Sequence, residues 1–472
     1  MLTQIANGDS RLSFWLRVRA YAVPPSMIET ATARRHAGDW AGACAAAGID
    51  VDLDLRSVAR THGRDLATRI RADLRHLAPD LLRWHMPRVA PDGLLRPGLT
   101  IALARYDAAG RDDGSPVHLV VRTPPAWADG GQRISLALWD GSHAEPGARR
   151  HPHPHPDRRF RLDLHRHLWD ARRSDALRVR SGAGALSAAS PPPDPDPDPD
   201  PDPLGLVPRE LRCAVDRWAD EAAILLRAEG RTDGTVAVRF GGRRRLLLEP
   251  AADRDGLRPP ALRITPAPTD GSIATLPVLP DAATWVLPDL DLIRTGSIEA
   301  GGLHPLVASA LVPDHAPAAG SPVPTGAGEP HLVECRGVRH RVGLVDGFLV
   351  PLDHDPAEIR REELLVALTG TPLPCLQFID QAHRRPDCLV GVRERLEHGD
   401  TSGALAVVEG LLGSEAVLRD GALRDALEAA ARRRIAYGLY RAGLVGPGPD
   451  RLRPGPCRPR DLRSRPRHTT AR

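Results

Sequence analysis

The chain has 472 residues, 42% hydrophobic and 26% charged, which suggests a globular protein of two to four domains. All 64 basic residues are Arg and none is Lys; this excludes a Walker-type phosphate loop, a protein-kinase site and Schiff-base or pyridoxal-phosphate chemistry, each of which needs a lysine amine. The net charge of +4 is too balanced to indicate that the whole chain binds nucleic acid.

The first predicted domain, residues 11–180, begins with helices. The segment RRHAGDWAGACAAAG, residues 34–48, is typical of two antiparallel helices joined by a Gly-Asp turn, with Asp39 capping the second helix. More helix is predicted between residues 54 and 85, because apolar residues recur there at three- to four-residue spacing.

The rest of this domain is predicted to be mainly antiparallel strands. After Pro97 the apolar pattern changes to a period of two, which predicts strands over residues 99–105, 117–122 and 134–139. A final helix is expected over residues 162–177.

A linker is predicted over residues 187–207, where five consecutive Asp-Pro pairs follow three prolines. Proline disfavours helix in the residue before it, and neighbouring aspartates repel each other. Such a segment favours an extended polyproline II conformation, at ~3.1 Å per residue, so it can span on the order of 40 Å between two halves of the chain.

A central domain is predicted over residues 208–355. A helix is expected over residues 208–229, followed by a β-hairpin in TVAVRFGGRRRLLLE, residues 235–249, and a short helix over residues 304–311. Residues 331–352 predict a three-stranded meander.

A helical bundle is predicted over residues 356–445, and it is followed by a disordered Arg- and Pro-rich tail, residues 446–472. The segment RLEHGDTSGALAVVEG, residues 395–410, repeats the Gly-Asp pattern of residues 34–48. Both segments resemble the helical hairpins of tetratricopeptide-type repeats, and the resemblance implies helix-hairpin packing alone, because no 34-residue period recurs. The expected fold class is therefore α+β and multi-domain, with helical hairpins near the N-terminus and at the C-terminus and small antiparallel β regions.

One pair of residues in the meander could support thiol chemistry. A hairpin that turns at Gly337-Val338 would place Cys335 directly opposite His340, with Cβ atoms about 5 Å apart. An imidazole beside a thiol can generate a thiolate nucleophile. The alternative is that Cys335 is a small core residue.

No metal or cofactor site is assigned from the sequence. His151, His153 and His155 would diverge in a polyproline helix, so this tract and the neighbouring His165 and His167 are expected to be solvated, with metal binding as the alternative. On one helix, Cys375 and His383 would lie ~12 Å apart, too far to share an ion. Asp380 could instead hydrogen-bond to His383, although such pairs are usually surface contacts.

Two basic segments could bind an anionic partner. They are Arg243–Arg245 and the tail, and both lack the aromatic side chains that stack on bases, so solvated charge is the simpler interpretation.

Together these observations predict a protein of the cytoplasm. The six cysteines are far apart and form no C-x-x-C, no apolar run reaches the ~20 residues of a membrane span, and the first ten residues lack a secretory apolar segment. The preferred function is that of a non-enzymatic interaction or scaffold protein whose partner is another protein. The alternatives are an enzyme with a thiol site near Cys335 and His340, and nucleic-acid binding through the tail.

Overall fold

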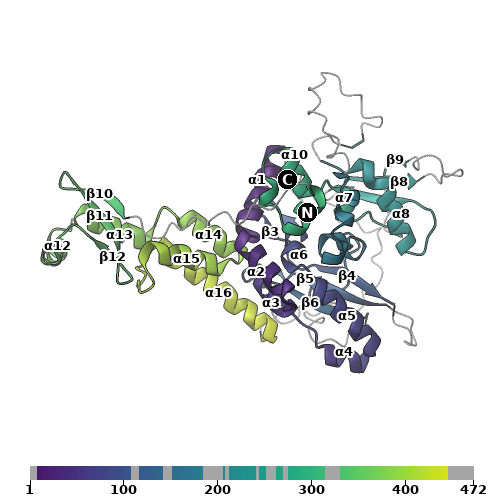
Figure 1. The fold of residues 1–472 in the computed structure, drawn as a ribbon, viewed down its shortest axis with the longest axis horizontal. Helices are drawn as coiled ribbons and strands as arrows, with labels where there is room; N and C mark the ends of the chain where they lie inside the picture. Colours follow the sequence, from purple (N-terminus) through teal and green to yellow (C-terminus); the bar gives the residue numbers. More distant parts are fainter. Residues whose placement is uncertain are drawn as a thin grey trace, which may run out of the picture.

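The computed structural model describes residues 8–107, 116–141, 151–183, 206–207, 212–240, 244–250, 262–268, 275–313, 330–370 and 372–444. The fold is α+β with several small, mainly antiparallel sheets, as predicted. We call the described residues between 8 and 313 the body, and those between 330 and 444 the arm. The arm extends to one side of the body (Figure 1).

The longer helices of the body precede its main sheet or pack beside it. The α-helices are α1 (Gly8–Arg17), α2 (Pro25–His36), α3 (Trp40–Ala46), α4 (Leu55–Thr61), α5 (Arg64–His76), α6 (Pro79–His85), α7 (Ala176–Arg180), α8 (Trp218–Ala228), α9 (Asp281–Thr284), α10 (Pro288–Arg294) and α11 (Pro305–Leu311). A π-helical turn, Val18–Ala22, continues α1.

The main sheet has the order β1-β6-β5-β4. Strands β4 (Thr100–Tyr106), β5 (Val117–Arg122) and β6 (Ile134–Trp139) form an antiparallel meander, and β1 (Ile49–Val51) adds a parallel edge to β6. The meander was predicted from its period of two. The parallel edge was not, because three residues are too few to show a period. A separate two-stranded ribbon joins β2 (Arg88–Val89) to β3 (Leu94–Leu95).

The largest hydrophobic core joins residues from both sides of the predicted linker. Trp15 and Trp84 are two of its largest buried side chains, with ring centroids 5.2 Å apart. Leu290 of α10 and Val307 of α11 belong to the same cluster. Apart from Leu206 and Val207, the linker lies outside the described residues, so its extended conformation stays a prediction.

A second, smaller core lies under α8, which packs on the sheet of β7 (Val236–Phe240), β8 (Arg244–Pro250) and β9 (Leu262–Pro266). This confirms the predicted hairpin. Of the helix predicted over residues 208–229, residues 208–211 lie outside the described part of the chain. The α-helix begins at Trp218, because Cys213 makes an extended bridge to Trp285 and a 3-10 turn follows over Val215–Arg217.

The helix predicted over residues 162–177 is also wrong. Three short 3-10 turns stand there, followed by α7. The backbone carbonyl of Trp169 accepts a hydrogen bond from Ala78 N–H, and the Asp170 carboxylate accepts from the backbone N–H of Arg172. These bonds compete with a continuous helix.

The arm contains a third core and a meander of β10 (His331–Cys335), β11 (Val338–Val345) and β12 (Phe348–Pro351), as predicted. Its helices are α12 (Pro356–Thr369), α13 (Pro374–Arg384), α14 (Leu389–His398), α15 (Thr401–Leu412) and α16 (Ala422–Ala442). Both predicted Gly-Asp hairpins form: Asp39 accepts from Gly42 N–H at the start of α3, and Asp400 accepts from Gly403 N–H at the start of α15. No helix in the described part of the chain has the length and apolarity to span a bilayer.

Candidate functional site

The arm is fastened to the body through the buried side chain of Arg83 on α6. Its guanidinium donates to the carbonyls of Ala22 and Gln132 in the body and to that of His398 in the arm, at 2.9, 2.6 and 2.9 Å. Burial lowers the pKa of Arg83 to about 10, but the group still carries its charge near neutral pH. One cation therefore holds three backbone segments together across the junction.

Ion pairs surround this anchor. Arg17 of α1 pairs with Glu394 of α14, and Arg441 of α16 pairs with Asp52 of the body. The Tyr437 hydroxyl donates to Asp50. The junction is thus a fixed, polar interface, which is not readable from the sequence because its partners are more than 300 residues apart.

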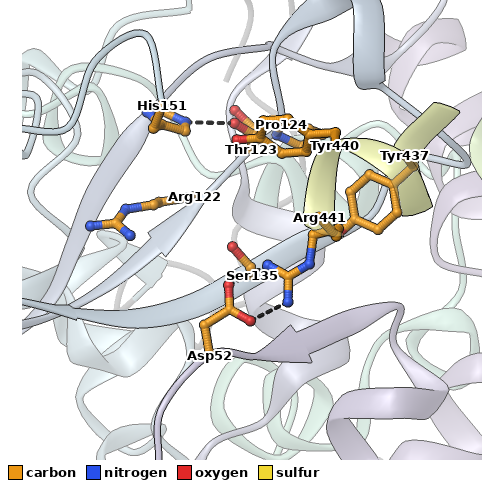
Figure 2. A pocket seen from close by; sticks show the side chains of 9 residues that line it. All are labelled: Asp52, Arg122, Thr123, Pro124, Ser135, His151, Tyr437, Tyr440 and Arg441. Carbon is orange, nitrogen blue, oxygen red and sulfur yellow. Dashed lines mark hydrogen bonds and ion pairs between the residues drawn. The ribbon is translucent and has the colours of Figure 1, made fainter. Parts of the chain in front are cut away.

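A small cavity at this junction lies between α16 and the main sheet (Figure 2). Its walls include Asp52, Arg122, His151, Tyr437 and Arg441, and its volume is about 50 Å³. This is room for little more than a water molecule or two. His151, expected to be solvated, is buried here: its Nε2 lies 2.9 Å from the carbonyl of Thr123, and burial lowers its pKa.

A larger cleft of about 420 Å³ opens on another side of the junction. Small residues and arginines form its walls, among them Gly131, Gly399, Arg83, Arg133 and Arg434. Neither a histidine nor a cysteine lines it. Arg83 is committed to carbonyls and Arg133 to Asp50. Ser402 lies 3.4 Å from the carboxylate of Asp400, but that carboxylate also pairs with Arg395 and accepts from Gly403 N–H at the start of α15.

The predicted pairing of Cys335 with His340 is wrong. The β10–β11 turn consists of Arg336 and Gly337, both with positive φ, so Cys335 lies opposite Val338 and His340 opposite Val333. Cys335 is fully buried, at 0% exposure, so a dissolved substrate has no path to its sulfur. His340 instead stacks on His354, with ring centroids 4.2 Å apart.

Cys335 has a partner that the sequence did not indicate. Cys375, in the first turn of α13, is also fully buried, and the two thiols contact each other. Burial, with Cys335 beside it, raises the pKa of Cys375 to about 11. One donor atom each from Cys335, Cys375 and His354 lies within 4.8 Å of the other two. Because α13 packs on β10 only in the folded arm, no spacing rule links these residues.

The other residues considered as site candidates make contacts that stabilise the fold or lie outside the described residues. Asp380 pairs with Arg384 and Arg419 rather than with His383, which is buried. Cys388, the next cysteine after Cys375 in the chain, directly precedes α14 and packs against the arm's hydrophobic core, but it is not one of the three residues whose donor atoms converge. Of the basic triplet, Arg244 and Arg245 lie in β8, while Arg243 and the tail are outside the described residues.

His165 and His167 are buried, not solvated as expected. His165 Nε2 lies 3.2 Å from Glu221 of α8. Burial opposes ionisation of Glu221, but His165 and Arg180 outweigh it and lower the pKa of this carboxyl to about 2. The ion pairs of Glu221 with His165 and Arg180 attach α8 to the rest of the body.

Exposed large apolar side chains gather on the arm. The described residues contain eighteen, and fourteen of them belong to the arm: Leu332, Val338, Leu344, Val345, Phe348, Leu352, Leu364, Leu365, Leu368, Val390, Leu405, Val417, Ile435 and Leu444. No family model, curated protein or solved structure matches the chain.

Proposed function

We propose that this chain is a non-enzymatic protein-interaction protein, in which the body holds the arm and the arm presents an apolar surface to a partner protein. The concentration of exposed apolar side chains on the arm carries this proposal, because exposed apolar surface that gathers in one region is typical of protein-binding sites.

Helix α12 is the part of the arm best suited to receive a partner. Leu364 and Leu368 are four residues apart, which places them on one face, and they are 70% and 84% exposed. We call these two residues the leucine stripe. The described residues of α12 contribute nothing to the arm's hydrophobic core.

Ion pairs hold α12 against the meander instead. Arg336, in the β10–β11 turn, contacts Glu358 at 3.2 Å and Glu362 at 2.5 Å. These acidic residues lie on the side of the helix that faces the sheet. Leu364 and Leu368 are turned away from that side, whereas Leu365, seven residues after Glu358, lies beside the acidic residues and is 45% exposed. A partner helix or groove of apolar character would bury the stripe at little cost in lost polar contacts.

The arm–body junction supports a presenting role. The three carbonyls bound by Arg83 and the ion pairs around it fix the arm in one orientation, which lowers the conformational entropy lost on binding.

We further propose that the protein works in the cytoplasm. The five described cysteines are free thiols, including the adjacent pair Cys335 and Cys375. Thiols in such proximity persist most readily in a reducing compartment.

The test uses the full-length chain and a partner identified by photocrosslinking from position 368. The purified partner is then titrated by calorimetry against the wild type, against the double variant Leu364→Ala/Leu368→Ala, and against Val179→Ala, an exposed apolar site on the body. We expect the double variant to bind about 30-fold more weakly, as for loss of a hot spot worth ~2 kcal/mol, and Val179→Ala to bind normally. Equal affinity for all three proteins, or the absence of any stoichiometric crosslinked partner, would refute the proposal.

A further inference from the structure

Three side chains of the kinds that bind zinc converge in the arm from separate segments. Cys335 ends β10, His354 lies between β12 and α12, and Cys375 is the second residue of α13. A donor atom from each lies within 4.8 Å of the other two. Tightening this triangle to the spacing around one ion requires only side-chain adjustment, since tetrahedral zinc–ligand bonds are about 2.0–2.3 Å.

The surroundings of this triad are those of an enclosed site. Both cysteines are fully buried, and His354 Nε2 is buried without a hydrogen-bond partner. An imidazole nitrogen in that condition is costly, because it has lost water and gained nothing in exchange. A metal ion at the centre of the triad would satisfy it.

The second ring nitrogen of His354 also has a neighbour that is typical of a metal-binding histidine. Its Nδ1 lies 3.5 Å from the carboxylate of Glu358. Histidines that bind zinc commonly direct their second nitrogen to a carboxylate, which fixes the tautomer and the orientation of the ring.

We propose that Cys335, His354 and Cys375 bind one Zn²⁺ ion that ties the meander to α13. Two thiolates and an imidazole form a donor set that selects zinc over magnesium or calcium. Binding converts both thiols to thiolates and releases two protons, while His354 binds through neutral Nε2. The fourth position falls to water or to His340, whose Nδ1 is buried without a partner and whose ring stacks on His354.

This site would be structural. The ion lies in the arm's core, where Cys335 and Cys375 already belong to one hydrophobic cluster, so it would cross-link the sheet to the helices. The inference is independent of the proposed function, because a zinc ion could stabilise the arm whatever the arm binds.

The experiment measures zinc in the full-length protein, purified without a polyhistidine tag or chelator, by native mass spectrometry and elemental analysis. We expect one zinc per chain in the wild type and in Cys388→Ser, which removes a cysteine of the same arm outside the triad. We expect loss of zinc in Cys375→Ser and His354→Gln. A His153→Ala/His155→Ala variant should keep its zinc, which separates the triad from adventitious binding at the histidine tract.

A second measurement does not depend on the variants folding. Wild-type protein stripped with a chelator is titrated with Co²⁺, and the expected result is one equivalent bound with the strong visible bands of a tetrahedral site and a thiolate charge-transfer band. Wild-type protein that contains no zinc after expression in zinc-supplemented medium and shows no thiolate band with Co²⁺ would overturn the proposal. So would a Cys335–Cys375 disulfide in the protein as isolated, or equal loss of zinc in Cys388→Ser.

Discussion

Gly399 of the arm packs directly against Gly131 of the body, and a Cβ atom at position 399 would overlap the Gly131 carbonyl. Gly399 also has a φ of +87°, a conformation that ends α14 and that other residues adopt at a cost. The junction therefore depends on the absence of a side chain at this point.

Replacing this glycine tests how tightly the arm is docked. Gly370→Ala is the matched control, because Gly370 also ends a helix with positive φ, at +72°, but has open space where a Cβ would lie. We expect Gly370→Ala to cost about 1 kcal/mol in free energy of unfolding, and Gly399→Ala to cost a further 1–3 kcal/mol from the overlap. Urea denaturation measures both, and similar losses in the two variants would argue against close packing at the junction.

Arg83 should be the strongest single contributor to the junction. Arg83→Met would leave three carbonyls without their charged donor, and we expect a loss of about 3 kcal/mol in free energy of unfolding. Arg434→Met, which alters an exposed arginine of the same cleft, should change stability by less than about 0.5 kcal/mol. Small-angle scattering of Arg83→Met should also show a wider distribution of distances between arm and body.

The stability of the junction should decrease in acid because of His398. Burial, assisted by Arg88, Arg83 and Arg17, lowers the pKa of His398 to about 3, although Glu394 lies 3.8 Å from its Nε2. In the unfolded chain the pKa is about 6.5, so between these values the unfolded chain binds the proton more readily. The stabilisation is complete above about pH 6.5 and decreases as the pH falls toward 3.

For this single group the expected loss between pH 7 and pH 5 is about 2 kcal/mol. Other buried histidines, such as His85 and His167, add to the slope in every variant. The informative quantity is therefore the difference between wild type and His398→Gln, followed by denaturation at several pH values. Parallel curves for the two proteins would show that folding does not shift the pKa of His398.

The carboxylate behind the proposed zinc ligand should tune metal affinity. Glu358→Gln removes the charge beside His354, and we expect zinc affinity to fall by roughly 10- to 100-fold, measured by competition with a coloured chelator. Glu362→Gln is the control, since Glu362 contacts Arg336 one turn further along α12. An equal effect of both substitutions would mean that only the attachment of α12 matters.

Local patterns in the sequence predicted a large part of the fold. The caps at Asp39 and Asp400 and the strands around residues 100–139 depend on neighbours in the chain, so they could be found without a structure. The β10–β11 register could not be fixed, because the turn places a non-glycine residue, Arg336, at a φ of +54° and thus shifts the pairing of Cys335.

The candidate sites depended on contacts between distant segments. Cys375 meets Cys335 only because α13 packs on the meander, and His151 is buried only because it reaches the carbonyl of Thr123. The sequence predicted helix around Leu364 and Leu368, but their exposure is a property of the assembled arm. Such facts follow from packing, which a single sequence does not specify residue by residue.

The position of α10 and α11 bears on how the protein is made. Because these helices supply Leu290 and Val307 to the core built around Trp15 and Trp84, a nascent chain that stops before residue 290 has an open apolar face. The N-terminal region therefore cannot complete its hydrophobic core until roughly the first two thirds of the polypeptide have been synthesised. Until then its apolar face stays exposed or is covered by a chaperone. For the same reason, a protease cut between residues 184 and 205 would give two fragments that remain bound to each other.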